Sequence, residues 1–323
     1  MSRFNFLHIS DLHISRFSSL KRIHKRSPGN YYDTIRHGIY AATHSKGRLS
    51  RLVSFINNQR EKLDAVIITG DIATTGLSFD LQDALAFVNG VPVGSSYLTA
   101  DGVPTIGGLG LPIFLLPGNH DRYRAFFKRL GYSPGGRDFR RVFNGFWNND
   151  VRTNIAEKDG HSVAVIAADL SLRRTHDCEE PRLWNKYAQG MVYPDILERL
   201  KEETETFQAK TAGTPSIVLW ALHFPPGFPG VGSDMKLLEE DSLIEAANDL
   251  GVSAILAGHT HEPSFYRRPN MLFDVYCAGS VTQFDLPTYN HCQIITVETS
   301  EDSPWIQVEH YKFDEIMATF VRV

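Results

Sequence analysis

Short apolar runs recur along the chain, and each ends in a polar turn. They are rich in Ile and Val and bounded by turn residues, a pattern typical of buried strands. The runs that predict strands are Phe4–Ile9, Ala65–Thr69, Ile113–Leu116, Ser162–Ala168, Ser216–Leu222 and Ser253–Ala257. Between them, apolar residues at helical spacing predict the helices Leu49–Lys62, Phe79–Val88, Arg137–Trp147, Pro194–Phe207 and Glu239–Leu250.

Strands that alternate with helices favour an α/β fold with largely parallel sheets. The end of the chain differs, because Met271–Ala278, Cys292–Glu298 and Trp305–Phe313 read as successive strands. We therefore expect a two-sheet α/β sandwich flanked by helices, formed by one domain over residues 1–323. Two stretches near residues 16–45 and 90–111 lack clear periodicity. Insertions of this length are usually lids, oligomer contacts or mobile surface.

Composition narrows the class of protein. The chain has 323 residues, of which 42% are hydrophobic, enough to bury a substantial core. Its formal net charge is −4, whereas a general nucleic-acid binder usually carries a basic excess, so extensive nucleic-acid binding is not expected. There is no secretory leader pattern and no apolar run of about 18 residues. We expect a cytoplasmic protein without membrane contact, with its three cysteines reduced and mostly buried.

Candidate chemistry sits where predicted strands end, the edge at which open α/β sheets bind ligands. Asp11 and His13 are two residues apart, so on an extended chain both side chains point the same way and can hold one cation. Asp71 follows Gly70, and its carboxylate has two oxygens that can bridge two cations. Each signal alone is weak, because Gly-Asp is also a common turn.

Three further segments add donors. Asn119, His120 and Asp121 are adjacent, although an Asx turn or a helix N-cap explains them equally well. His223 ends a predicted strand, where a lone histidine is more often structural than a ligand. The pair formed by residues 259 and 261, both histidines, is the strongest signal, because two imidazoles at this spacing after a strand can chelate a transition metal.

The combined set matters more than any member. It mixes nitrogen and oxygen donors without a thiolate, which suits Mn, Fe or Zn rather than Mg or Ca alone. Seven ligands are too many for one closed four-coordinate site. They suit two metal ions that share a carboxylate, and the candidate ligands are Asp11, His13, Asp71, Asn119, His223, His259 and His261.

In this order, the segments resemble the calcineurin-like metallophosphoesterase superfamily, from residue 4 to about 262. The resemblance implies a four-layer α/β/β/α fold and a water activated by the metals for attack on phosphorus. It implies that His120 protonates the leaving oxygen or stabilises the transition state, with Asp121 orienting it. It also implies how the ligands are divided between the two metals. One metal is held by Asp11, His13, Asp71 and His261, and the other is held by Asp71, Asn119, His223 and His259.

A shorter resemblance concerns one branch. The segments 222–226 (Leu-His-Phe-Pro-Pro) and 279–284 (Gly-Ser-Val-Thr-Gln-Phe) are similar to class III cyclic nucleotide phosphodiesterases. The chain departs from the family at residues 73–75, Ala-Thr-Thr, close to a position where members often carry another Asp. The leading expectation is hydrolysis of a small phosphodiester, with a cyclic nucleotide as candidate substrate.

Other functions stay open. A phosphomonoesterase, a nuclease or a protein phosphatase would use the same metal site. A non-catalytic scaffold that binds partners is a different class, and it predicts loss of some ligands or of His120, all of which are present. An oligomer is compatible with the sequence. His8 is expected to be a hydrogen-bonded core residue, and the histidines that match no motif are expected to be surface or structural: His24, His37, His44, His161, His176, His291 and His310.

Overall fold

The computed structural model describes residues 1–15, 44–91, 102–122, 124–126, 131–133, 138–173, 188–230, 235–283, 290–299 and 305–323, and in residues 124–126 and 131–133 only the backbone. Residues 16–43, most of the first predicted insertion, and residues 92–101, part of the second, therefore lie outside the described residues. Within the described part, no helix is both long and apolar enough to cross a membrane.

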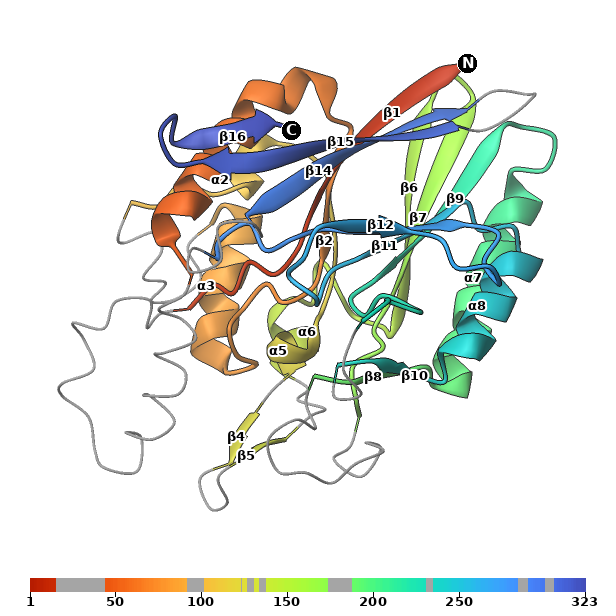
Figure 1. Cartoon of the computed structure of the whole chain (residues 1–323), viewed down its shortest axis with the longest axis horizontal. Helices are drawn as coiled ribbons and strands as arrows, with labels where there is room; N and C mark the ends of the chain where they lie inside the picture. The colour runs from red at the N-terminus through yellow and green to blue at the C-terminus, as the bar shows by residue number, and fades with distance from the viewer. Residues whose placement is uncertain are drawn as a thin grey trace.

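Two six-stranded sheets form the centre of the molecule (Figure 1). The first has the order β16 (Thr319–Arg322), β15 (Trp305–Asp314), β14 (His291–Thr299), β1 (Ser2–Ile9), β2 (Ala65–Thr69) and β3 (Ile113–Leu116). The second has the order β12 (Ser264–Tyr266), β13 (Asp274–Cys277), β11 (Ala254–Ala257), β9 (Ser216–Leu222), β7 (His161–Ala168) and β6 (Val151–Lys158). Two small pairs join β10 (Leu237–Leu238) to β8 (Gly190–Met191) and β4 (Arg124–Phe126) to β5 (Gly131–Ser133).

Helices cover the outer face of each sheet, which confirms the expected two-sheet sandwich (Figure 1). Beside the first sheet lie α2 (Lys46–Gln59), with the 3₁₀ turn η2 (Arg60–Lys62), and α3 (Ser78–Asn89). Beside the second lie α7 (Pro194–Lys210) and α8 (Glu240–Asp249). The short elements are η3 (Gly107–Leu109), α5 (Asn119–Arg122) and α6 (Asp138–Val142).

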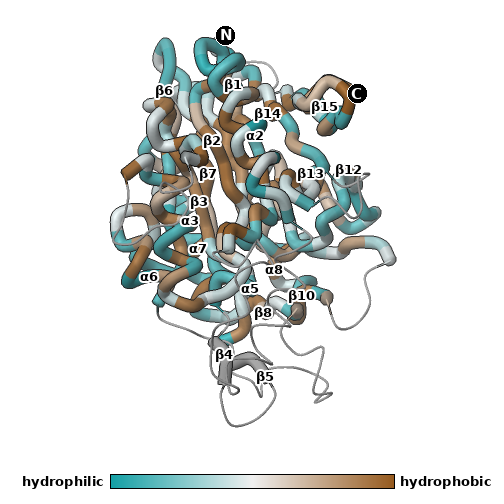
Figure 2. Tube along the Cα trace, turned by 90° about the vertical axis from the view of Figure 1, so that its left-hand side faces the viewer, coloured by the Kyte–Doolittle hydropathy of each residue, from teal (hydrophilic) through white to brown (hydrophobic). Residues whose placement is uncertain are grey.

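Strand β7 shows why its apolar run forms a central strand. Val163 and Val165 face the core that β7 shares with the first sheet, while Ala164 and Ile166 face the core under α7 and α8. Alternate residues thus enter two different cores, so both sets must be apolar. Figure 2 shows that β2, β3 and β7 are hydrophobic along the middle of the molecule.

The sheets are mixed, so the expectation of largely parallel sheets is wrong in part. Strands β1, β2 and β3 pair in parallel, as do β7, β9, β11 and β13, but β14 to β16, β6 and β12 pair antiparallel. The helix expected over Arg137–Trp147 is α-helical only over Asp138–Val142. Asn144 and Gly145 follow, and both are weak helix formers.

Two other expectations about buried groups are confirmed. Cys277 and Cys292 are buried and form no disulfide, and burial raises the pKa of both thiols; Cys178 lies outside the described residues. His8 is fully buried, with Nε2 2.9 Å from Thr69 Oγ1 and Nδ1 accepting from Gln293 Nε2 at 2.7 Å.

Candidate dinuclear metal centre

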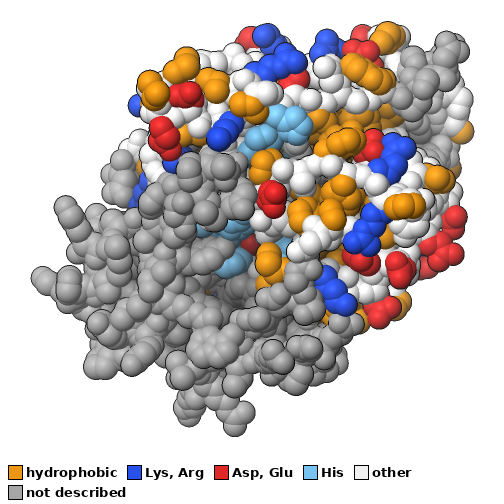
Figure 3. Space-filling view, in the orientation of Figure 1, with side chains coloured by type: hydrophobic (Ala, Val, Ile, Leu, Met, Phe, Trp, Pro, Cys, Tyr) orange, Lys and Arg blue, Asp and Glu red, His pale blue; other side chains and the backbone are white. Residues whose placement is uncertain are grey.

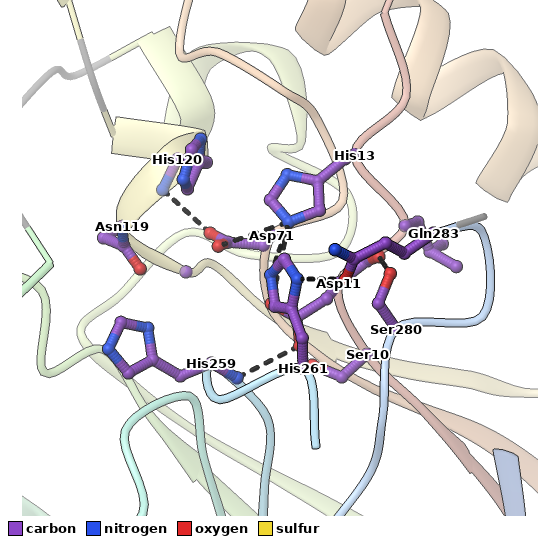
Figure 4. Close-up of polar contacts among 12 residues, drawn as sticks. Ser10, Asp11, His13, Asp71, Asn119, His120, His259, His261, Ser280 and Gln283 are labelled. Atoms are coloured by element: carbon purple, nitrogen blue, oxygen red, sulfur yellow. Dashed lines mark hydrogen bonds and ion pairs between the residues drawn. The ribbon is translucent and has the colours of Figure 1, made fainter. Parts of the chain in front are cut away.

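The ligands predicted from the sequence come from strand ends in both sheets. Asp11, Asp71 and Asn119 follow the neighbouring strands β1, β2 and β3, while His223 and His259 follow β9 and β11 of the second sheet. The structure brings these segments together, and Figure 4 shows Asp11, Asp71, Asn119 and His259 gathered in one place.

Three side chains point at one another at one end of the cluster. Nε2 of His13 lies 3.0 Å from Nε2 of His261, and Asp11 Oδ1 lies 3.2 Å from the same His261 nitrogen. Asp11 Oδ1 is buried and accepts no hydrogen bond from the described residues. Two imidazole nitrogens and a carboxylate oxygen that converge in this way have the arrangement of ligands around one cation.

A second group lies beside the first. Nε2 of His223 is 2.9 Å from Asn119 Oδ1 and 3.3 Å from Asp71 Oδ2. The same Asp71 oxygen is 3.9 Å from His13 Nε2. Asp71 therefore lies between the two groups, where a bridging carboxylate has to be.

Hydrogen bonds to oxygen acceptors orient three of the imidazoles. Nδ1 of His223 lies 2.7 Å from the Thr69 carbonyl oxygen, and Nε2 of His259 lies 3.1 Å from the carbonyl oxygen of residue 235, a methionine. Nδ1 of His261 lies 2.8 Å from Gln283 Oε1. When one ring nitrogen donates its proton to such an acceptor, the other presents a lone pair, which is the usual arrangement around a metal-binding histidine.

The backbone is strained at the candidate ligands. Asp11, His13 and Asp71 have φ of 54°, 45° and 49°, and the two histidines of the 259–261 pair have 70° and 57°. L-residues rarely adopt this left-handed region, and it costs on the order of 1–3 kcal/mol when other contacts impose it. Here, backbone bonds from Asp11 N to the Gly70 carbonyl at 3.1 Å and from His13 N to the Asp71 carbonyl at 2.9 Å hold the turns in place.

Two glycines allow the loops to approach closely. A Cβ atom at Gly118 would overlap Asp71 Oδ1, and one at Gly258 would overlap Ser10 Oγ and crowd Asp11 Oδ2. The glycines of these motifs are therefore needed because the carboxylates lie against the backbone of another loop.

Charge pairing sets the protonation of the cluster. Burial lowers the pKa of His223, but the Asp71 carboxylate outweighs burial and raises it to about 9. Burial favours the neutral acid at Asp11 and Asp71, yet the neighbouring histidines keep the pKa of both carboxyls below the usual value. Burial, reinforced by His223, lowers the pKa of His259 to about 3. Metals bind ionised carboxylates and neutral imidazoles, so binding would release the proton that His223 holds at neutral pH in the metal-free protein.

The side chain of His120 lies beside the centre without entering either group described above. Its Nδ1 is 2.9 Å from the Thr74 carbonyl oxygen, and its ring centroid is 4.7 Å from that of His13. The role of orienting His120, which the resemblance implies for Asp121, stays a prediction. The Asp121 carboxylate accepts three backbone N–H bonds at 2.7–3.1 Å, from Ala73, Gly118 and Ile72. Asp121 thus fixes the loops after β2 and β3 relative to each other, and its burial, together with Asp71, raises its pKa to about 7.

Residues 280–283 support the metal centre, although the sequence analysis predicted no role for them individually. Ser280 Oγ donates to the Asp11 carbonyl at 2.7 Å, and Thr282 Oγ1 donates to the Leu12 carbonyl at 2.9 Å. Gln283 holds the His261 ring. Resemblance of this segment to phosphodiesterases was the only sequence signal that could have pointed to it.

His44 was expected at the surface or in a structural role. It is not at the surface, because it is 5% exposed and its ring centroid lies 4.5 Å from that of His13. No motif surrounds His44, so its position beside the ligands could not be predicted from the sequence.

The site fits two metal ions. Asp71 Oδ2 lies 3.3 Å from His223 Nε2 in one ligand group and 3.9 Å from His13 Nε2 in the other. Asp11 Oδ1 offers a buried acceptor without a hydrogen-bond donor among the described residues. His120 also has a ring nitrogen within 4.8 Å of ligand atoms of His13 and Asp71, although the resemblance assigns it to the reaction and not to a metal. Histidine side chains reach the surface in two places in Figure 3, one of them beside the residues that are not described.

A comparison with known families agrees with this geometry. The sequence model of the family described as calcineurin-like phosphoesterase matches residues 4–263. This chain belongs to that family. The match covers most of the chain and includes all seven candidate ligands, and the family depends on two metal ions. No curated protein matches the sequence significantly.

Solved structures show the same fold at low identity. A dimetal phosphatase from Danio rerio is 15% identical with a TM-score of 0.53, over 94% of this chain and 95% of that one. GAP50 of Plasmodium, described as an anchor in the inner membrane complex, is 12% identical with a TM-score of 0.52, over 100% and 89%. The purple acid phosphatase PPD1 of yellow lupin is 11% identical with a TM-score of 0.53, over 99% of this chain and 53% of the other.

Proposed function

We propose that this chain is a two-metal hydrolase of small phosphodiesters, with a cyclic nucleotide as the candidate substrate. The observation that carries the two-metal assignment is the position of Asp71, whose Oδ2 lies 3.3 Å from His223 Nε2 and 3.9 Å from His13 Nε2. One metal would be held by Asp11, His13, Asp71 and His261, and the other by Asp71, Asn119, His223 and His259. Manganese, iron or zinc suits these donors.

When bound, the cations supply an acidic water as nucleophile and neutralise charge on the phosphoryl oxygens. The protein supplies the proton for the leaving group. Nδ1 of His120 donates a hydrogen bond to the Thr74 carbonyl, so Nε2 is the ring nitrogen left for the reaction. Nε2 of His120, once protonated, would donate to the oxygen that leaves phosphorus. Burial lowers the pKa of His120, and the Asp71 carboxylate opposes that shift.

The diester preference rests on the sequence. The segments 222–226 and 279–284 are similar to those of cyclic nucleotide phosphodiesterases, and Gln283 of the second supports the centre. The net charge of −4 disfavours long nucleic acids, whose binding relies on many phosphate contacts. The cytoplasm is the compartment that we propose for this activity.

A direct test compares kcat/KM for cyclic AMP, an aryl phosphodiester and an aryl phosphomonoester on protein loaded with the same metal. We expect both diesters to exceed the monoester. A tenfold preference for the monoester, about 1.4 kcal/mol in transition-state binding, would replace the diester assignment with a phosphomonoesterase. If the protein bound two metals but cleaved none of the three, the scaffold function would be favoured.

The role of His120 is tested separately. His120→Ala should keep both metals, because its ring contacts the Thr74 carbonyl and lies beside the proposed ligands. It should lower kcat by about 10²–10⁴, the range for a lost general acid. Loss of metal with unchanged turnover per loaded enzyme would show that His120 is a ligand instead.

A further inference from the structure

We propose that His44 is a third imidazole ligand of the metal held by Asp11, His13 and His261. This inference rests on the proposed two-metal function. The family resemblance assigns nothing to this residue, which lies between the first two metal-binding motifs and directly follows residues 16–43. It would make this metal richer in nitrogen donors than the second one.

The backbone fixes the position of His44. The residue forms an antiparallel bridge with Gln283, and Ser45 N donates to the Thr282 carbonyl at 2.9 Å. Arg48, in the first turn of α2, donates to the Gln283 carbonyl. His44 is therefore attached to the same segment whose Gln283 side chain holds His261. A histidine that was only structural would not need to share the support of a metal ligand.

The side chain lies at the metal end of this support. The His44 ring centroid is 4.5 Å from that of His13 and 6.0 Å from that of His261. One ring nitrogen of each of the three lies within 4.8 Å of the other two. Nitrogens that bind the same ion at about 2.1 Å each lie roughly 3–4 Å apart, so a small rotation brings His44 into the coordination sphere.

Chemistry favours a cation at this point over bare packing. Nε2 of His13 lies 3.0 Å from Nε2 of His261, and the His44 ring lies beside that of His13. His44 is 5% exposed, and Leu12 and Leu49 line the pocket next to it. A transition metal can bind three neighbouring imidazole lone pairs at once, so a buried cluster of this composition suits a cation.

The test measures metal binding rather than turnover. Wild-type protein, His44→Ala and the control His161→Ala would be stripped of metal and titrated with Co²⁺ against a competing chelator, with the visible spectrum recorded at each step. His161 is a partly buried histidine at the first position of β7, and it is hydrogen-bonded to Thr299. We expect His44→Ala to weaken one of two binding steps by about 10–100-fold, as loss of a metal-orienting group does, and to change the Co²⁺ spectrum. His161→Ala should match the wild type.

The outcomes separate this inference from the function. If the wild type binds two Co²⁺ ions and His44→Ala reproduces both affinities and the spectrum, His44 is not a ligand, and a raised KM in that variant would assign it to the substrate instead. If the wild type itself binds fewer than two ions, the two-metal function fails together with this inference. Thermal melting of the metal-free proteins checks folding. Should His44→Ala unfold, His44→Gln keeps most of the volume without the imidazole, and unchanged Co²⁺ binding in it would overturn the assignment.

Discussion

Gln283 offers the sharpest test of how the centre is supported. Its Oε1 accepts a hydrogen bond from His261 Nδ1 at 2.8 Å, and the residue is buried, with 8% of its surface exposed. Gln283→Leu removes this acceptor but keeps the backbone contacts to Arg48 and His44, which use main-chain atoms of residue 283. The His261 ring would then lose its fixed orientation and tautomer, and Nε2 would no longer be directed at the metal.

The magnitude follows from the type of contact. Loss of an outer partner of a metal-binding histidine costs about 10–100-fold in affinity, or roughly 1.4–2.7 kcal/mol. Gln283→Glu keeps an oxygen acceptor, so its affinity should equal or exceed that of the wild type. The expected order of metal affinity is therefore Glu at least equal to Gln, and both above Leu.

Isothermal titration of metal-free protein with Mn²⁺ measures this order. Gln208→Leu is the matched control, because Gln208 also uses its amide in one hydrogen bond, to the Leu250 carbonyl at 2.7 Å, but on α7. It should leave metal affinity unchanged. If Gln283→Leu bound both metals as tightly as the wild type, the orienting role of Gln283 would be refuted.

Three further predictions concern the bridge, a loop and the core. Asp71→Asn should weaken both metal steps in the same titration, since Asp71 Oδ2 lies near His223 of one ligand group and His13 of the other; weakening of one step alone would contradict the bridge. Gly118→Ala should lower metal content measured by elemental analysis and cost about 1–3 kcal/mol of stability, because its Cβ would overlap Asp71 Oδ1. Burial, reinforced by His291, lowers the pKa of His8 from 6.5 to about 3, so in that interval the unfolded chain binds the extra proton and stability falls as pH falls. From pH 6.5 to 5, His8 should account for a loss of about 2 kcal/mol, and urea unfolding of His8→Gln should show a smaller loss than the wild type.

The fold could be predicted where a strand is buried on both faces. Three strands have the bounds expected from the sequence: Ala65–Thr69, Ile113–Leu116 and Ser216–Leu222. A short, continuous apolar run that ends in turn residues is typical of a buried strand. Strand β6, Val151–Lys158, was missed. It lies at a sheet edge and is half exposed, so its residues carry no apolar run.

The candidate ligands could be predicted because each strand end has a motif of its own. The groups around them could not. Thr74 uses its carbonyl to hold His120, and any residue could supply that atom. Gln283 and His44 act across 22 and 31 residues, on His261 and His13. The spacing of residues along the chain does not predict these contacts, because they depend on how distant loops pack against one another.

The two sheets contribute different chemistry to the centre. Strands β1 to β3 of the first sheet lead to Asp11, His13, Asp71 and Asn119, three oxygen donors and one imidazole, whereas β9 and β11 of the second lead only to imidazoles. Each proposed metal takes ligands from both sheets, because His261 completes the group of Asp11 and His13, and His223 and His259 complete the group of Asp71 and Asn119. The metal centre therefore depends on correct packing of one sheet on the other. The bond from His259 N to Asp11 Oδ2 at 3.0 Å directly joins the two halves. A substitution that shifts the sheets should consequently impair metal binding before it unfolds either sheet.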